Sequence, residues 1–85
     1  MPPLPQLIIT TPGQLGEIMR ARRKSRKLSQ QQLATKLGVS QGRLSTLEGN
    51  PAGMTLDRLI MIANVLGLEL VLRDKFDTPA TPSEW

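Results

Sequence analysis

The stretch SQQQLATKLGVSQGRLSTLEG, residues 29–49, decides the fold class. It contains two helix starts, because Ser29 followed by Gln32 is a capping-box pattern and Ser40 is a favourable N-cap residue. Apolar residues recur at helical spacing after each start, at Leu33, Ala34, Leu37, Leu44 and Leu47. Only a two-residue turn, beginning with Gly38, separates the two runs. Two short helices joined by a tight, glycine-containing turn are typical of a helix-turn-helix, which we therefore predict here.

Two further helices are expected around this unit. Thr11-Pro12-Gly13-Gln14 is another capping box, with proline at the first helical position, and it predicts a first helix that ends near Arg26-Lys27. The residues expected on its core face are Leu15, Ile18, Met19 and Arg22. Those expected to point outward are Arg20, Arg23 and Lys24. Thr55 is the expected cap of a fourth helix, which Gly67 ends.

Two segments outside the helices have the character of short β-strands. Residues 6–10 are rich in β-branched side chains, and residues 68–74 alternate so that one face carries Leu68, Leu70 and Leu72. Because a lone strand is not stable, we expect these segments to pair with each other, with their copies in a second subunit, or with both. A chain of 85 residues without cysteine has a small core and no disulfides, which favours a homodimer stabilised by such a shared sheet.

The expected organisation is mostly α, with four to five helices and a short β-strand that pairs across a homodimer. Residues 1–10 form a leader and short strand, and residues 11–67 form the helix-turn-helix domain. Residues 68–74 form the dimerisation strand. Residues 75–85, which are polar and contain two prolines, are expected to be a disordered tail.

The distribution of charge indicates an anionic partner. Basic residues occur throughout residues 18–47 without a single Asp or Glu, although the net charge of the chain is only +4. Duplex DNA is the anion that such a block fits, because its phosphates release counterions when they are neutralised. The alternative is a solvated helix face that serves solubility. Acidic membrane lipid fits less well, because the block lacks aromatic residues for the membrane interface.

Composition argues against several functions. The chain has no histidine and no cysteine, so we expect no metal site and no cofactor. An enzyme is not expected, since there is also no glycine-rich phosphate loop and no carboxylate pair placed for acid–base chemistry. Glu48 is the acid nearest the second helix of the helix-turn-helix, the recognition helix, and we expect it to interact locally with that helix or to take part in its packing. No apolar run is long enough to span a bilayer, and we expect a cytoplasmic protein.

The candidate DNA contacts follow from which side chains the core leaves free. On the second helix of the motif these are Gln41, Gly42, Arg43, Ser45 and Thr46, whose polar groups can bond base edges, while the bare backbone of Gly42 allows close approach. Gln30, at the start of the preceding helix, is expected to hold a phosphate, and Arg23 and Lys27 are expected to contact the DNA backbone. The alternatives are ordinary surface polarity for Gln41 and Arg43, and a simple helix start for Gln30.

The segments LSQQQLA (28–34), LGVSQ (37–41) and LSTLE (44–48) resemble the Cro/C1-type (XRE) helix-turn-helix family, over about residues 12–67. The resemblance implies a lambda-repressor-like fold in which the glutamine at Gln30 holds phosphate. It also implies that Ser40, Gln41, Gly42, Ser45 and Thr46 face bases, while Arg43 contacts base or phosphate. Gly42 departs from the family, whose members often carry a side chain there, so readout at this position is expected to be weaker.

The order of parts, with a strand after the helices and a polar tail ending in Glu84-Trp85, resembles the HipB-type antitoxins that accompany HipA-type serine/threonine-kinase toxins. This implies a type II toxin–antitoxin system, whose antitoxin dimer represses its own operon and neutralises a HipA-like kinase. Trp85 is predicted to anchor in a pocket of that kinase, because tryptophan is a favoured hot-spot residue. The alternative is an incidental terminus, or a ring packed on its own domain.

Two other functions stay open from the sequence. A stand-alone Cro/C1-type transcriptional regulator would keep the operator DNA and the homodimer but lack the toxin, and genomic adjacency to a kinase-like reading frame separates the two. A protein-interaction module that no longer binds DNA is the third. Binding of random duplex at low and high salt tests it, because a module without phosphate contacts releases no counterions.

Overall fold

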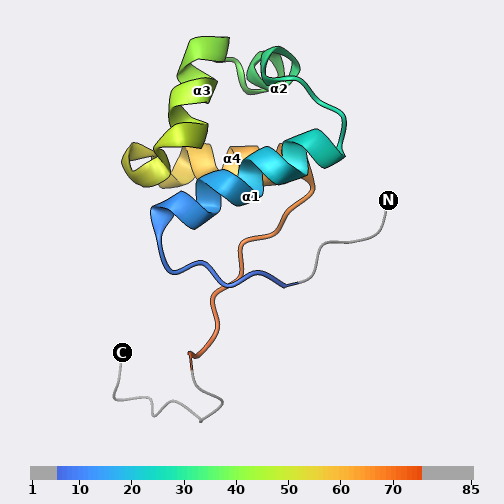
Figure 1. Cartoon of the computed structure of the whole chain (residues 1–85). Coiled ribbons are helices and arrows are strands. Elements are labelled where there is room, and N and C mark those ends of the chain that lie inside the picture. The colour runs from blue at the N-terminus through green and yellow to red at the C-terminus, as the bar shows by residue number, and fades with distance from the viewer. Residues whose placement is uncertain (1–5, 76–85) are drawn as a thin grey trace.

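The computed structural model describes residues 6–75. It contains four α-helices and one short 3-10 turn in the order α1 Pro12–Ser25, α2 Gln30–Leu37, α3 Gln41–Gly49, η1 Pro51–Gly53 and α4 Leu56–Leu66. Figure 1 shows α2 and α3 together at one end of the domain, with α1 and α4 crossing beneath them. The mostly helical fold and the positions of its helices confirm the prediction.

Each helix begins where a hydroxyl side chain satisfies free backbone N–H groups. Thr11 and Ser29 form complete capping boxes, because the side-chain oxygens of Gln14 and Gln32 accept a hydrogen bond from the backbone N–H of the cap residue. The side chains of Ser40 and Thr55 cap α3 and α4. The ends of α2 and α4 depend on left-handed glycines, Gly38 at φ 71° and Gly67 at φ 72°.

The core lies where the four helices meet. Its fully buried large side chains are Met19, Leu33, Leu44, Ile62 and Leu66. Ala34 and Leu37 complete the cluster, and Val39 in the turn packs against it. Each fully buried aliphatic side chain is worth about 1.5–3 kcal/mol relative to exposure, so these few residues contribute a large favourable share of the hydrophobic free energy of folding. The core residues predicted from helical spacing in α2 and α3 are confirmed as buried.

Within residues 6–75 of the single chain no strand forms, so the two flanking segments do not pair with each other, and their pairing across a dimer stays a prediction. Residues 6–10 and 68–74 have no regular secondary structure, and the ribbon passes them near each other below α1 (Figure 1). One hydrogen bond joins them, from Arg73 Nη1 to Gln6 Oε1 at 3.0 Å. A strand needs a partner for its backbone groups, and the single chain offers no ladder here. Leu72 in this segment is fully exposed, at 101%.

Two predicted features lie outside the described residues. These are the role of Trp85 in binding a partner and the disorder of the tail beyond Lys75. Among the described residues, no helix is both long and apolar enough to cross a membrane. The same residues contain no group of three or more potential metal-ligating side chains.

Candidate nucleic-acid interface

The α2–turn–α3 unit has the geometry that its sequence predicts. Gly38 turns the chain in the left-handed conformation, and the N–H of Val39 donates to the carbonyl of Ala34 at 3.0 Å. Leu33 and Leu44 pack in the same core cluster, so the two helices are held against one body. The first turn of α3 is left at the surface.

The predicted base-contacting residues gather on this exposed side of α3. Gln41, Gly42, Arg43, Ser45 and Thr46 are all exposed, and so is the cap residue Ser40. A Cβ placed on Gly42 would meet nothing within 4 Å. Packing within the chain therefore does not require glycine at that position. With no side chain, Gly42 leaves bare backbone at the surface.

Two of these hydroxyl groups already have intramolecular partners. Ser40 Oγ accepts the backbone N–H of Arg43 at 3.1 Å, and Thr46 Oγ1 donates to the carbonyl of Gly42 at 3.1 Å. Both bonds are local to α3 and leave oxygen lone pairs free. The two hydroxyl groups can therefore still accept or share a bond at the surface.

Arg23 requires a correction. It was expected to point outward beside Arg20, yet it is only 7% exposed. Its Nε donates to Glu48 Oε2 at 2.8 Å, and its Nη1 donates to the carbonyl of Leu28 at 2.9 Å. The physical reason is helical geometry, because position 23 lies one turn after the buried Met19 and shares its face.

Glu48 is the residue whose importance the sequence reasoning understated. It is 2% exposed, in the last turns of α3, and it forms an ion pair with Arg23 of α1. The sequence did predict packing of Glu48 near its own helix, and the partner on α1 was missed. Two features of the sequence could have indicated this pair. Glu48 follows directly after a segment whose charged residues are all basic, and Arg23 lies one helical turn after Met19, which was expected on the core face of the first helix.

Gln30 and Gln41 meet above this ion pair. Gln30 is half-buried, and its Nε2 donates to Glu48 Oε1 at 3.0 Å. The Nε2 of Gln41 lies 3.5 Å from Gln30 Oε1, at the long limit of a hydrogen bond. The predicted phosphate-binding and base-reading glutamines are thus neighbours, and the buried carboxylate contacts the first of them.

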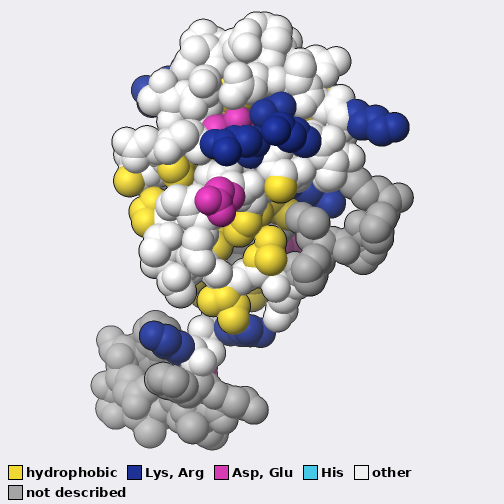
Figure 2. Space-filling view, in the orientation of Figure 1, with side chains coloured by type: hydrophobic (Ala, Val, Ile, Leu, Met, Phe, Trp, Pro, Cys, Tyr) yellow, Lys and Arg dark blue, Asp and Glu magenta, His cyan; other side chains and the backbone are white. Residues whose placement is uncertain are grey.

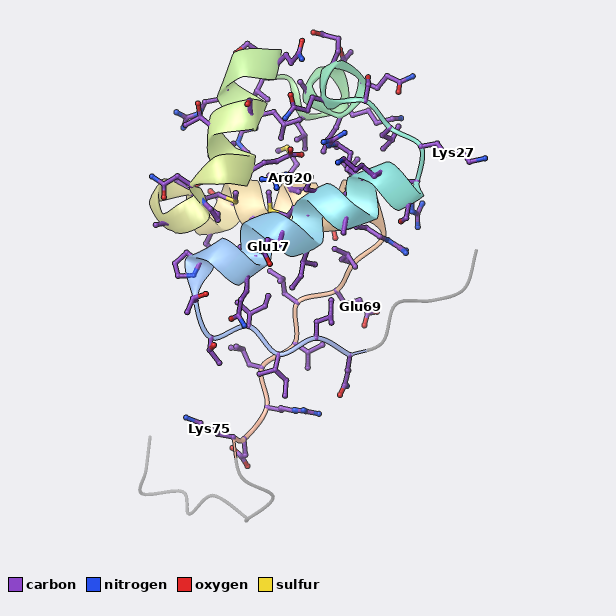
Figure 3. The ribbon with its side chains drawn as sticks, in the orientation of Figure 1. Glu17, Arg20, Lys27, Glu69 and Lys75 are labelled. Atoms are coloured by element: carbon purple, nitrogen blue, oxygen red, sulfur yellow. The ribbon has the colours of Figure 1, made fainter. Side chains whose placement is uncertain are left out.

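Exposed basic residues lie on α1, on α3 and between α1 and α2. Lys27 takes a positive φ of 59° between α1 and α2 and points away from the body of the domain (Figure 3). Arg20, Lys24 and Arg43 are also exposed. Figure 2 shows dark blue basic side chains across the middle of one face, with hydrophobic side chains below them. On this face the central basic group and most of the hydrophobic side chains occupy different areas, although another basic side chain lies beside the lowest hydrophobic group.

The apolar surface lies on α4 and the two flanking segments. Its exposed large hydrophobic residues are Leu7, Ile8, Ile9, Leu56, Ile60, Met61, Leu70, Val71 and Leu72. A shallow hollow between Ile60, Asn64 and Leu70 opens on the same side. Exposed apolar surface on this scale in a small domain is typical of an interaction site.

Comparison with known proteins identifies the family. The family described as Helix-turn-helix (HTH_3) matches residues 19–72. Antitoxin HipB of Escherichia coli (strain K12) is 35% identical over 66 residues, which is 78% of this chain and 75% of HipB. The chain belongs to the helix-turn-helix family of HipB. Both resemblances inferred from the sequence are thereby confirmed.

Solved structures of HipB share the fold. The HipA-HipB-O2-O3 complex matches with a TM-score of 0.75 and 32% identity, covering 84% of this chain and 100% of that chain. The HipB-O4 20mer complex matches with the same TM-score, identity and coverage. The described fold, including the helix-turn-helix geometry, is therefore the HipB fold.

Proposed function

We propose that this chain is the antitoxin of a type II toxin–antitoxin system: a homodimeric repressor that binds operator DNA of its own operon and neutralises a HipA-like serine/threonine kinase. The observation that carries the DNA-binding part is the exposed first half of α3, which presents Gln41 beside Gln30 and leaves Arg43 and Ser45 at the surface. The solved complexes of the relative HipB with O2-O3 and with an O4 20mer support it.

In this proposal α3 enters the major groove with its N-terminus first. Gln41 bonds the N6 and N7 edge of an adenine, and Arg43 contacts a guanine edge or a phosphate. Ser40, Gly42, Ser45 and Thr46 face the remaining bases. Gln30 holds a phosphate at the N-terminus of α2, where the helix dipole and free N–H groups favour an anion. Lys27 contacts the DNA backbone. The buried Arg23 contributes indirectly, through its ion pair with Glu48, which in turn binds Gln30.

The dimer in this proposal is formed by the leucine face of residues 68–74, which is one part of the apolar surface. Leu68 packs against the core in the single chain, while Leu70 and Leu72 are exposed and available to a second copy. Pairing of residues 68–74 across the two subunits would satisfy backbone groups that have no ladder in one chain. Two recognition helices in a dimer would reach major grooves about 34–36 Å apart, which requires a palindromic operator.

The kinase partner is proposed on the strength of the relative's complex with HipA. Trp85 is proposed to anchor in a pocket of the kinase. Two experiments test the proposed function: selection of duplexes from a random library by the full chain, and co-purification of the full chain with a kinase-like partner. Enrichment of a palindrome together with kinase capture is the expected result. Enrichment without capture points to a stand-alone regulator, and failure of both contradicts the proposal.

A further inference from the structure

The buried ion pair holds the carboxylate of Glu48 in one orientation. Arg23 donates from Nε to Oε2 at 2.8 Å and from Nη2 to Oε1 at 3.4 Å. The guanidinium is itself anchored by the carbonyl of Leu28. A side-on, two-point contact between guanidinium and carboxylate fixes the plane of both groups. Glu48 Oε1 is thus a stationary acceptor beneath the DNA-facing surface.

This acceptor determines which way the amide of Gln30 faces. A glutamine amide has one donor side and one acceptor side, whereas a carboxylate paired with arginine offers acceptors only. Only the Nε2 side of Gln30 can therefore face Glu48, and in the structure Nε2 lies 3.0 Å from Glu48 Oε1. The Oε1 of Gln30 is turned toward Gln41, and the second N–H of Nε2 is free for a phosphate.

The orientation passes from Gln30 to Gln41. Because Gln30 presents the acceptor Oε1, Gln41 must donate to it from Nε2, which lies 3.5 Å from that oxygen. The second N–H of Gln41 and its Oε1 are then left for DNA, in a fixed order. Adenine presents an acceptor at N7 and a donor at N6, so only one order of the two amide atoms matches it in a given helix placement.

We propose that Glu48 is a positioning residue for base readout, which sets the direction of both amides through Gln30. This inference rests on the proposed DNA-binding function and adds a specificity determinant that never touches DNA. A purely structural role for the ion pair predicts something different: loss of Glu48 would lower stability without changing which base is chosen.

Two variants of the full chain separate these roles. In Glu48→Gln, the amide oxygen at position 48 must serve Arg23, so its NH2 faces Gln30 and both glutamine amides are expected to invert. In Arg23→Met/Glu48→Leu, apolar side chains replace the ion pair, an exchange that buried ion pairs often tolerate without loss of stability. The matched control is Arg22→Met, which removes a buried bond to the carbonyl of Leu66 and leaves Glu48 and Gln30 untouched.

The first readout is the side-chain amide resonances of Gln30 in the free chain, measured by 15N–1H NMR. We expect wild type and Arg22→Met to show an N–H shifted downfield by the carboxylate, with slowed exchange. The double variant is expected to show the shifts of a free glutamine. Free-glutamine shifts in the wild-type chain would overturn the inference without any reference to DNA.

The second readout is the sequence enriched from a random duplex library and the affinity for the wild-type consensus. Both Glu48 variants are expected to lose about tenfold in affinity for that consensus, the worth of one charge-assisted hydrogen bond. Glu48→Gln is expected to change the preferred base at one position per half-site, and the double variant to relax it. An unchanged consensus and an affinity within about twofold of wild type, in a folded double variant, would overturn the inference. A wild-type chain that enriches no sequence contradicts the proposed function instead, and the NMR readout then decides the orientation of Gln30.

Discussion

Arg23 of α1 and Glu48 of α3 form an ion pair of 2.8 Å in which both residues are less than a tenth exposed. It ties the recognition helix to the first helix of the domain. Removal of one partner of such a pair strands a buried charge, which costs about 3–5 kcal/mol. We therefore expect Arg23→Ala to lower the free energy of unfolding by that order, measured by urea denaturation.

The control for this prediction is Arg20→Ala, at an exposed position on the same helix. Its effect on the free energy of unfolding is expected to stay within about 0.5 kcal/mol. If Arg23→Ala proves as mild as Arg20→Ala, the ion pair does not hold α3 in place.

Gly16 permits the close approach of α1 and α3. It is buried, and a Cβ at this position would collide with the backbone carbonyl of Glu48. Gly16→Ala is expected to destabilise the domain by about 1–3 kcal/mol, as overpacking does. Gly13→Ala, on the same helix with open space around it, is expected to be neutral or to stabilise by less than about 1 kcal/mol. Thermal melts of both variants would refute this packing if their order were reversed.

Gln41 is the central base reader of the proposed function. Gln41→Ala is expected to weaken binding of the selected duplex by about 1–3 kcal/mol and to relax the choice of one base pair. Gln31→Ala makes the same chemical change on α2, where the side chain bonds Thr35, and should leave the enriched sequence unchanged. Retention of the wild-type consensus by Gln41→Ala would mean that α3 is not placed as proposed.

Lys27 is expected to act on every duplex equally. Lys27→Ala should weaken the selected and a scrambled duplex by the same factor, and should lower the salt dependence of binding by about one phosphate contact. Titrations of both duplexes at several salt concentrations measure this. A loss confined to the selected duplex would instead make Lys27 a specificity residue.

The alternation of residues 68–74 gives a test of the dimer. Leu72→Lys is expected to convert the dimer to a monomer in sedimentation velocity, because the leucine face is buried in the proposed shared sheet. Val71→Lys, on the opposite face, should leave the dimer intact. Dissociation by Val71→Lys alone would reverse the assigned face, and a monomeric wild-type chain would contradict the dimer.

The helices could be predicted from sequence because their signals are local. Capping boxes at Thr11 and Ser29 and the glycine at Gly38 act within a few residues, so the observed helix starts and the motif turn follow directly. The same holds for the apolar faces of α2 and α3. The candidate base contacts Gln41, Gly42, Arg43, Ser45 and Thr46 were predicted as the residues that the core leaves free, and all five are exposed.

The misses involve long-range contacts. Arg23 meets Glu48 across 25 positions of the chain, and general rules place an arginine at the surface. The space that Gly16 leaves for the carbonyl of Glu48 has no signal in the local sequence. The strand expected at residues 68–74 needs backbone partners that one chain does not provide, so its pairing across a dimer stays a prediction.

The measurement that tests the central claim most directly is the ratio of two affinities of the full chain at one salt concentration. One affinity is for the duplex it selects, and the other is for a scrambled duplex of the same length and composition. Sequence-specific binding through α3 predicts a ratio of about 10³ or more, which Gln41→Ala reduces by about tenfold or more. Equal affinities for the two duplexes would contradict the account.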